Sequence, residues 1–412
     1  MSDRTATAPA VDRSAWRWRT YPRAIVFAIL LAFPIVLLTT TEPEVSIQSS
    51  IGGDLPTFVA AGDIVWSGDG RQLYDLDRQF EAQAGFWEND GSLILYVYPP
   101  AFAAPYAPLS TLDYKVVYLV HTAVMFGSLL LTVRMARDLM PFLADPRASN
   151  AALAAALLFL PMFVGSMVGQ ATAVFLLGLT ATWWGIARHR EVVAGLGLAL
   201  LLLKPQYGVP VLGLVFLARR WRAFTVALAG IAAAWIVSVL LSGPTWHADW
   251  YELVRSLSTV DLGSNLDKEV SILGLAEVVL GAGSDLAFAL WVLASAALVL
   301  AVLWRLRQRP FLDPYALALV PPMLLLIAPH ALYYDAGFLL LSLGLLLPTV
   351  PPARRALVLL AWFVGGVSHL VHDSLGVQPV ALVVFGTLAW AWWASSPGRV
   401  PAPAEEIVPV AS

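Results

Sequence analysis

The sequence predicts an all-α protein that spans a membrane many times. Hydrophobic residues make up 59% of its 412 residues and charged residues only 13%, against about a quarter charged in soluble domains. Apolar runs recur along the chain, and a helix needs roughly 20 such residues to cross the hydrocarbon core. We therefore expect one bundle of membrane helices rather than the two or three soluble domains that length alone would indicate.

We expect about 11 to 12 transmembrane helices, which follow the apolar runs. They are placed at residues 24–40, 115–133, 150–166, 171–187, 191–203, 207–218, 223–241, 285–304, 314–329, 334–348, 355–371 and 378–394. No small-residue cleavage site follows the first run, so it is expected to be a retained span. Residues 1–23 would then be a cytoplasmic segment, 24–395 a single transmembrane domain, and 396–412 a Pro-rich, disordered cytoplasmic tail.

The basic residues predict the orientation in the membrane. On this arrangement, short loops on one side hold most of the 25 Lys and Arg residues; those on the other side are Arg71, Arg78, Lys115, Lys204, Arg255 and Lys268. Cytoplasmic loops carry the excess of positive charge. We therefore expect a cell-membrane protein with both termini in the cytoplasm. The long segments 41–113 and 242–284 would be extracytoplasmic and contain interfacial helices.

Lys204 interrupts the apolar run 191–218. A single helix there would place Arg188 and Arg190 on the opposite side from Arg219 and its neighbours, so we expect two short helices that meet at Lys204. Twelve helical residues extend about 18 Å, less than the roughly 30 Å core, which leaves Lys204 recessed. A recessed ammonium can bind a lipid phosphate, pair with a structural acid, or extend to the headgroups, and the sequence leaves these alternatives open.

Asp54 follows the first apolar run, in the sequence Gly52-Gly53-Asp54-Leu55-Pro56. A carboxylate at the membrane surface can act as a general base toward an acceptor hydroxyl. Asp before Leu-Pro is also a favourable helix start, which predicts an N-cap. The two roles are compatible, because a cap holds the carboxylate in place.

Two proline motifs on the same predicted face carry further polar groups. Tyr98-Pro99-Pro100 precedes a short apolar stretch that either re-enters the bilayer edge or forms a stiff turn. Pro329-His330 is followed by Tyr334 and Asp335. His330 could bind phosphate, relay a proton, or serve a structural role.

Metal, cofactor and nucleic-acid binding are not predicted. The chain has no cysteine, and therefore no thiolate ligand or disulfide. His369, His372 and Asp373 show a weak ligand spacing that does not by itself predict a metal site. The formal net charge of −3 does not favour nucleic-acid binding.

These segments, in this order, resemble glycosyltransferase family 87. The resemblance covers most of residues 50–340, and its motifs include Gly53-Asp54, Tyr98-Pro99-Pro100, Gly169-Gln170, Lys204-Pro205-Gln206 and Pro329-His330 with Tyr334-Asp335. Members are polyprenol-phosphate-mannose-dependent mannosyltransferases with the C-type glycosyltransferase (GT-C) fold. The resemblance implies that Asp54 matches the catalytic acid, that Lys204 lies near the donor phosphate and that His330 lines the same cavity. Leu55-Pro56 departs from the family's aromatic or polar run.

We therefore expect an inverting transfer of a hexose, with mannose the favoured sugar, from a polyprenyl-phosphate donor to a glycolipid or glycan acceptor. Asp54 would be the base at the extracytoplasmic face, and Lys204 and His330 would bind the donor phosphate. The substrate cavity would be lined by Tyr98, Gln170, Gln206, Tyr207, Tyr334 and Asp335. A transporter or flippase of lipid-linked or sugar substrates would also use recessed charges and a broken hairpin. The gathering of acids on one predicted face favours the enzyme.

Overall fold

A computed structural model describes residue 28 and residues 52–86, 93–260, 265–310 and 312–398 of the chain. Among these residues all regular structure is helical, apart from one isolated antiparallel bridge between Glu269 and Leu332. The all-α fold is therefore confirmed. The expected segment 1–23, nearly all of the expected span 24–40 and most of the tail 396–412 lie outside the described residues.

Four described helical segments are long and apolar enough to cross a membrane. They are α5 (Tyr114–Leu139), α11 (Trp221–Ser242), α15 (Asp285–Arg307) and Pro352–Leu375, which contains α19 (Pro352–Val367) and α20 (His372–Leu375). A further apolar pair, α6 (Pro146–Leu158) and α7 (Leu160–Met167), is bent by 65° at its junction. Many apolar side chains of α11 and α15 are exposed, as expected of helices that face lipid. The chain is a multi-pass membrane protein.

The other expected spans are shorter apolar helices. They include α8 (Thr172–Ala187), α9 (Glu191–Leu202), α10 (Pro205–Leu217), α17 (Val320–Ile327), α18 (Leu339–Leu346) and α21 (Val380–Ala394). The break between α9 and α10 falls at Leu203 and Lys204, as the charge pattern predicts. Residues 314–329 and 334–348 contain short helical pieces rather than single long helices, because prolines and tight turns interrupt them.

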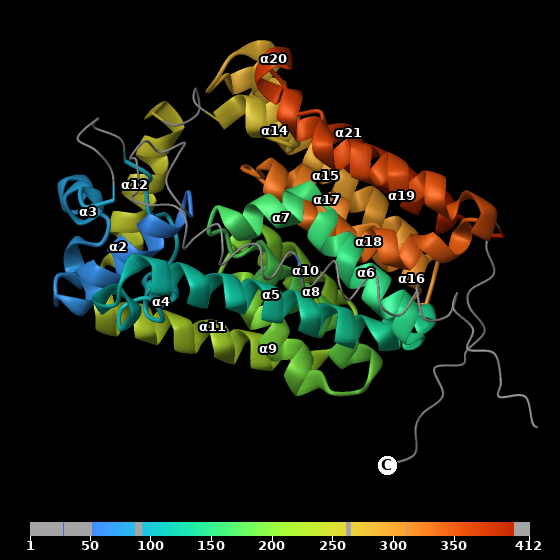
Figure 1. Ribbon diagram of the computed structural model, residues 1–412, viewed down its shortest axis with the longest axis horizontal. Coiled ribbons are helices and arrows are strands. Elements are labelled where there is room, and N and C mark those ends of the chain that lie inside the picture. The colour runs from blue at the N-terminus through green and yellow to red at the C-terminus, as the bar shows by residue number, and fades with distance from the viewer. Residues whose placement is uncertain (1–27, 29–51, 87–92, 261–264, 311, 399–412) are drawn as a thin grey trace, which may run out of the picture.

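The two long segments outside the predicted bundle also fold into helices. The first contains α2 (Leu55–Trp66), α3 (Leu76–Gln83) and α4 (Pro100–Ala103), and the second contains α12 (Trp246–Val260) and α14 (Ile272–Leu280). In Figure 1, α2, α3 and α12 gather beyond one end of α5 and α11, while α14 and α20 lie together at the end of α21. These short helices and their connections place the polar residues of the candidate site.

Candidate active site

Two interlocked turns position Asp54. Gly53 (φ +44°) and Gly169 (φ +80°) both adopt left-handed backbone conformations that glycine tolerates best. The Asp54 N–H donates to the Val168 carbonyl at 2.7 Å. A Cβ on Gly169 would lie 2.5 Å from the Leu55 Cβ and 2.7 Å from its backbone nitrogen. The start of α2 is therefore locked against the connection between α7 and α8.

The Asp54 side chain is directed to Gln170 instead of to its own helix. Asp54 occupies the N-cap position of α2, but its carboxylate accepts no capping hydrogen bond. Gln170 Nε2 donates to Asp54 Oδ2, and Gln170 Oε1 accepts from the Tyr98 hydroxyl at 3.4 Å. Gln170 is only 7% exposed. This chain of hydrogen bonds orients the carboxylate from a buried, fixed amide.

Both long segments hold Tyr98 in place. The Tyr74 hydroxyl donates to the Tyr98 carbonyl at 2.8 Å, and Trp250 Nε1 donates to the Val97 carbonyl at 2.8 Å. The Tyr98 ring stacks on Phe102, with centroids 4.6 Å apart. Burial, followed by the carboxylates of Asp335 and Asp54, raises the pKa of the Tyr98 hydroxyl well above its usual value. The hydroxyl therefore stays protonated and available as a donor to Gln170.

Replacing Gln170 with alanine is expected to lower turnover by about 10- to 100-fold, because a hydrogen bond to a charged group contributes roughly 1.5–3 kcal/mol. The Asp54 carboxylate would remain but lose its fixed orientation. Steady-state kinetics should show the loss in kcat with little change in KM. The exposed Gln72 provides a matched control, since Gln72→Ala should retain wild-type kcat. A Gln170→Ala enzyme with full activity would show that this amide does not orient the acid.

Lys204 forms a buried ion pair with Asp335. Lys204 Nζ lies 2.7 Å from Asp335 Oδ1, and the two side chains are only 10% and 2% exposed. The ammonium also lies 5.0 Å from the centroid of the Tyr207 ring and 5.9 Å from that of Phe175, within the range of cation–π attraction. Leu332 N donates to the other oxygen of Asp335 at 3.3 Å. Of the alternatives for Lys204, the structure shows pairing with an acid and not extension to the headgroups.

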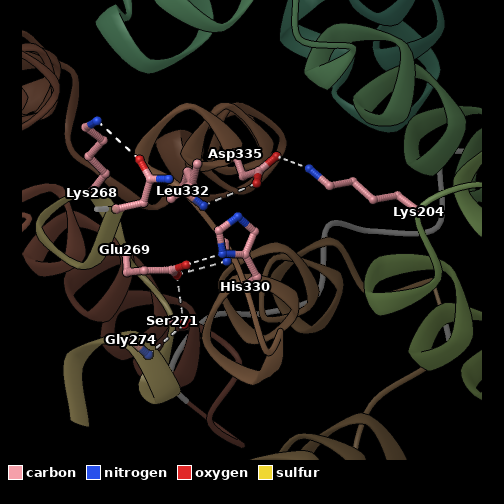
Figure 2. A network of polar contacts seen from close by, with 10 residues as sticks. Lys204, Lys268, Glu269, Ser271, Gly274, His330, Leu332 and Asp335 are labelled. Atoms are coloured by element: carbon pink, nitrogen blue, oxygen red, sulfur yellow. Dashed lines mark hydrogen bonds and ion pairs between the residues drawn. The ribbon is translucent and has the colours of Figure 1, made fainter. Parts of the chain in front are cut away.

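His330 forms a second ion pair, with Glu269 of the second long segment (Figure 2). Glu269 is buried, and its Oε2 accepts hydrogen bonds from Ser271 Oγ at 3.1 Å and from Ala331 N at 3.0 Å. Val270 N also donates to the Ala331 carbonyl at 2.8 Å. The His330 side chain itself is 53% exposed. Both oxygens of the Glu269 carboxylate therefore have partners, and the imidazole that it holds remains about half exposed.

Electrostatics keep His330 largely cationic near neutral pH. The surrounding protein disfavours the charged ring, but the Glu269 carboxylate outweighs this effect and raises the pKa of His330 to about 8. Lys204 and Asp335 also act on the ring, in opposite directions. Figure 2 shows the ring between the Glu269 carboxylate and the Lys204–Asp335 pair. Two cations therefore lie within electrostatic reach of each other, each beside its own carboxylate.

The three remaining candidate residues have different surroundings. Tyr334 is buried, and Asp54, Asp335 and Tyr98 lie near enough to act electrostatically on its hydroxyl. Tyr207 is fully buried against Lys204 and Phe338, behind the ion pair. Gln206 is half-buried, and no polar contact among the described residues joins it to the others.

Sequence reasoning missed Glu269. Its signal was a charged cluster, Asp267-Lys268-Glu269, in an otherwise apolar segment. The sequence carried no sign that this cluster meets the residues after α17, because the two lie far apart along the chain. Among the described residues, the bridge between Glu269 and Leu332, the hydrogen bonds of Ala331 and the ion pair with His330 bring them together.

The helices and these polar contacts define a membrane protein with a candidate site that contains an oriented carboxylate and two cations, each paired with an acid. Residues 96–329, more than half of the chain, match the model of glycosyltransferase family 87. The chain belongs to this family, and it is a membrane glycosyltransferase. No curated protein and no solved structure matches it. The matched region contains Tyr98, Gln170 and Lys204; it ends one residue before His330 and does not include Asp54.

Proposed function

We propose that the protein transfers a hexose, with mannose the favoured sugar, from a polyprenyl-phosphate donor to a glycolipid or glycan acceptor at the extracytoplasmic face. The observation that carries this proposal is the orientation of Asp54. Its carboxylate is held by the buried Gln170 rather than used to cap α2. Such an arrangement suits a general base, which must point at the hydroxyl that it deprotonates.

In the proposed reaction Asp54 accepts the proton of the acceptor hydroxyl. The acceptor oxygen then forms a bond to the anomeric carbon while the bond from that carbon to the phosphate oxygen breaks. The electron pair of the broken bond leaves with the polyprenyl phosphate on the opposite face of the sugar. One displacement therefore inverts the anomeric configuration, and the proton remains on Asp54 until solvent removes it.

Lys204 and His330 are proposed to bind the donor phosphate. The phosphate carries one negative charge in the donor and gains another as it leaves, so nearby cations favour the transition state over the ground state. Asp335 and Glu269 hold the two cations before substrate arrives. His330 is the more exposed of the two cations and offers the first contact, whereas Lys204 is nearly buried. The family match favours this enzyme over a transporter.

The direct test is sugar transfer by the purified protein. Radiolabelled polyprenyl-phosphate-mannose and membrane-lipid acceptors would be supplied in detergent or vesicles, and the labelled lipid product would be separated and its anomeric configuration determined. An inverted product supports the proposal. A product that retains the donor configuration would contradict the single displacement, and movement of intact donor across vesicles without transfer would favour a flippase.

Activity is expected to fall as the pH rises above about 8, where His330 loses its charge. The activity falls rather than rises because the pKa of His330 is raised: the imidazole is charged at lower pH and loses its charge as the pH passes through about 8. Glu269, Lys204 and Asp335 are the charged groups that act on the ring. A pH–rate profile of kcat/KM should therefore show an alkaline limb near this value.

The variant His330→Arg tests whether deprotonation of His330, and not of another group, causes the loss of activity near pH 8. Arginine keeps its charge across the accessible pH range, so the variant should lose the limb near pH 8 while retaining measurable transfer. His247→Gln, a change at an exposed histidine of α12, should leave the profile unchanged. An identical limb in His330→Arg would assign it to another group.

A further inference from the structure

Three side chains with metal-binding donors converge outside the catalytic network. His372 Nε2 lies 3.2 Å from Asp267 Oδ2 and 3.2 Å from Asp373 Oδ1. One donor atom from each of the three lies within 4.8 Å of the others. Asp267 belongs to η4 (Leu266–Lys268) in the second long segment, whereas His372 and Asp373 begin α20. His369 of the sequence pattern does not belong to this group of donors, and its Nδ1 contacts Gln378.

The orientation of the His372 ring directs a lone pair into this group. His372 Nδ1 lies 2.7 Å from the His369 carbonyl oxygen, and since a carbonyl only accepts, Nδ1 carries the proton and donates it. The side chain is buried, with 8% of the residue exposed, and among the described residues its Nε2 makes no hydrogen bond. Two carboxylate oxygens therefore face a nitrogen lone pair, an arrangement that repels unless a cation lies among them.

The two separations that involve the imidazole match those around a single zinc ion, and the third donor pair lies within 4.8 Å. Zinc binds imidazole nitrogen and carboxylate oxygen at about 2.0–2.2 Å, which places neighbouring ligands of a tetrahedral site roughly 3.3 Å apart. The two nitrogen–oxygen distances here are both 3.2 Å. A backbone carbonyl on the second ring nitrogen is also the usual outer-shell partner of a metal-binding histidine.

We propose that Asp267, His372 and Asp373 bind a divalent ion of the zinc class, with water in the fourth position. The donors are one imidazole nitrogen and two carboxylate oxygens, a set that suits zinc and similar transition metals. The role of the ion is structural. The ion connects η4 to α20 through Asp267. Asp267 lies only two residues before Glu269, the partner of His330, so the ion also stabilises the segment that positions that imidazole.

Zinc binding to the metal-stripped full-length protein tests this site. The protein would be purified without a polyhistidine tag and titrated with zinc, while bound metal is measured by atomic emission and thermal unfolding is followed in detergent. Wild type should bind about one equivalent of zinc and unfold at a higher temperature, because metal binding adds to the free energy of folding. Chelation should reverse both effects, and magnesium should produce neither.

Asp373→Asn is the decisive variant because the Asp373 side chain is 82% exposed, so its replacement costs no packing. Its zinc affinity, and that of Asp267→Asn, should fall by at least ~10-fold. His247→Ala, a change at an exposed histidine outside the group, should bind zinc as wild type does. Equal zinc binding by wild type and Asp373→Asn, or no change in unfolding temperature with zinc, would overturn the proposal and leave a proton as the cation at His372.

Discussion

Replacing Asp54 with asparagine is expected to lower turnover by about 10²–10⁴-fold, the usual contribution of one general base. Asparagine has nearly the same shape and can still accept a hydrogen bond from Gln170 through its amide oxygen. The turn formed by Gly53 and Gly169 should therefore persist, and donor binding should change little. Single-turnover transfer of radiolabelled sugar, measured beside equilibrium binding of the donor, separates the two quantities.

Asp63→Asn is the matched control for this variant. Asp63 lies on the same helix, α2, but is exposed, and its contact with Arg78 is long, at 4.0 Å. The control should retain wild-type turnover. Equal transfer by wild type and Asp54→Asn would leave Asp54 with a structural role at the start of α2, and would make Asp335 the next carboxylate to test as the base.

Replacing Lys204 with methionine is expected to destabilise the protein by about 3–5 kcal/mol, the typical cost of breaking one side of a buried ion pair. Methionine fills most of the volume of the lysine stem but leaves Asp335 buried without its cation. Reversible unfolding in detergent, compared between wild type and variant, measures the loss. Lys115→Met, at a half-buried lysine in the first turn of α5, should cost much less.

The double variant Lys204→Met with Asp335→Leu separates stability from substrate binding. Removing both charges should restore most of the lost stability, because apolar replacements of a buried pair are often neutral or better. Donor binding should not recover, since the proposed phosphate ligand is still missing. A double variant that binds and transfers donor normally would show that the pair serves only to hold α10 and the residues after α17 together.

Much of the fold could be predicted because membrane helices are encoded locally. The apolar runs at 115–133, 223–241 and 285–304 became α5, α11 and α15, each of which extends a few residues beyond the run. The conflict between arginines on either side of 191–218 correctly indicated the break at Lys204. The lengths of the other helices could not be predicted from hydropathy, because an apolar residue buried against protein looks the same in sequence as one that faces lipid.

The sequence allowed candidate site residues to be proposed, but it did not allow their contacts to be predicted. The resemblance to the family supplied Asp54, Lys204 and His330. It did not show that Gln170, 116 positions along the chain from Asp54, would orient the carboxylate, or that Asp335, 131 positions from Lys204, would neutralise the ammonium. These pairings depend on helix packing and on turns, and neither leaves a local pattern in one sequence.

The bridge between Glu269 and Leu332 ties the pairing of two backbone segments to the charge of His330. Val270 donates to the Ala331 carbonyl, and Ala331 donates to the Glu269 carboxylate, so residues 269–271 and 330–332 form one hydrogen-bonded unit. Any motion that separates these two segments also breaks the ion pair with Glu269 that keeps His330 protonated. In the proposed mechanism, such an opening would remove the positive charge of His330 and weaken phosphate binding, so the product lipid would leave as the imidazole loses its proton.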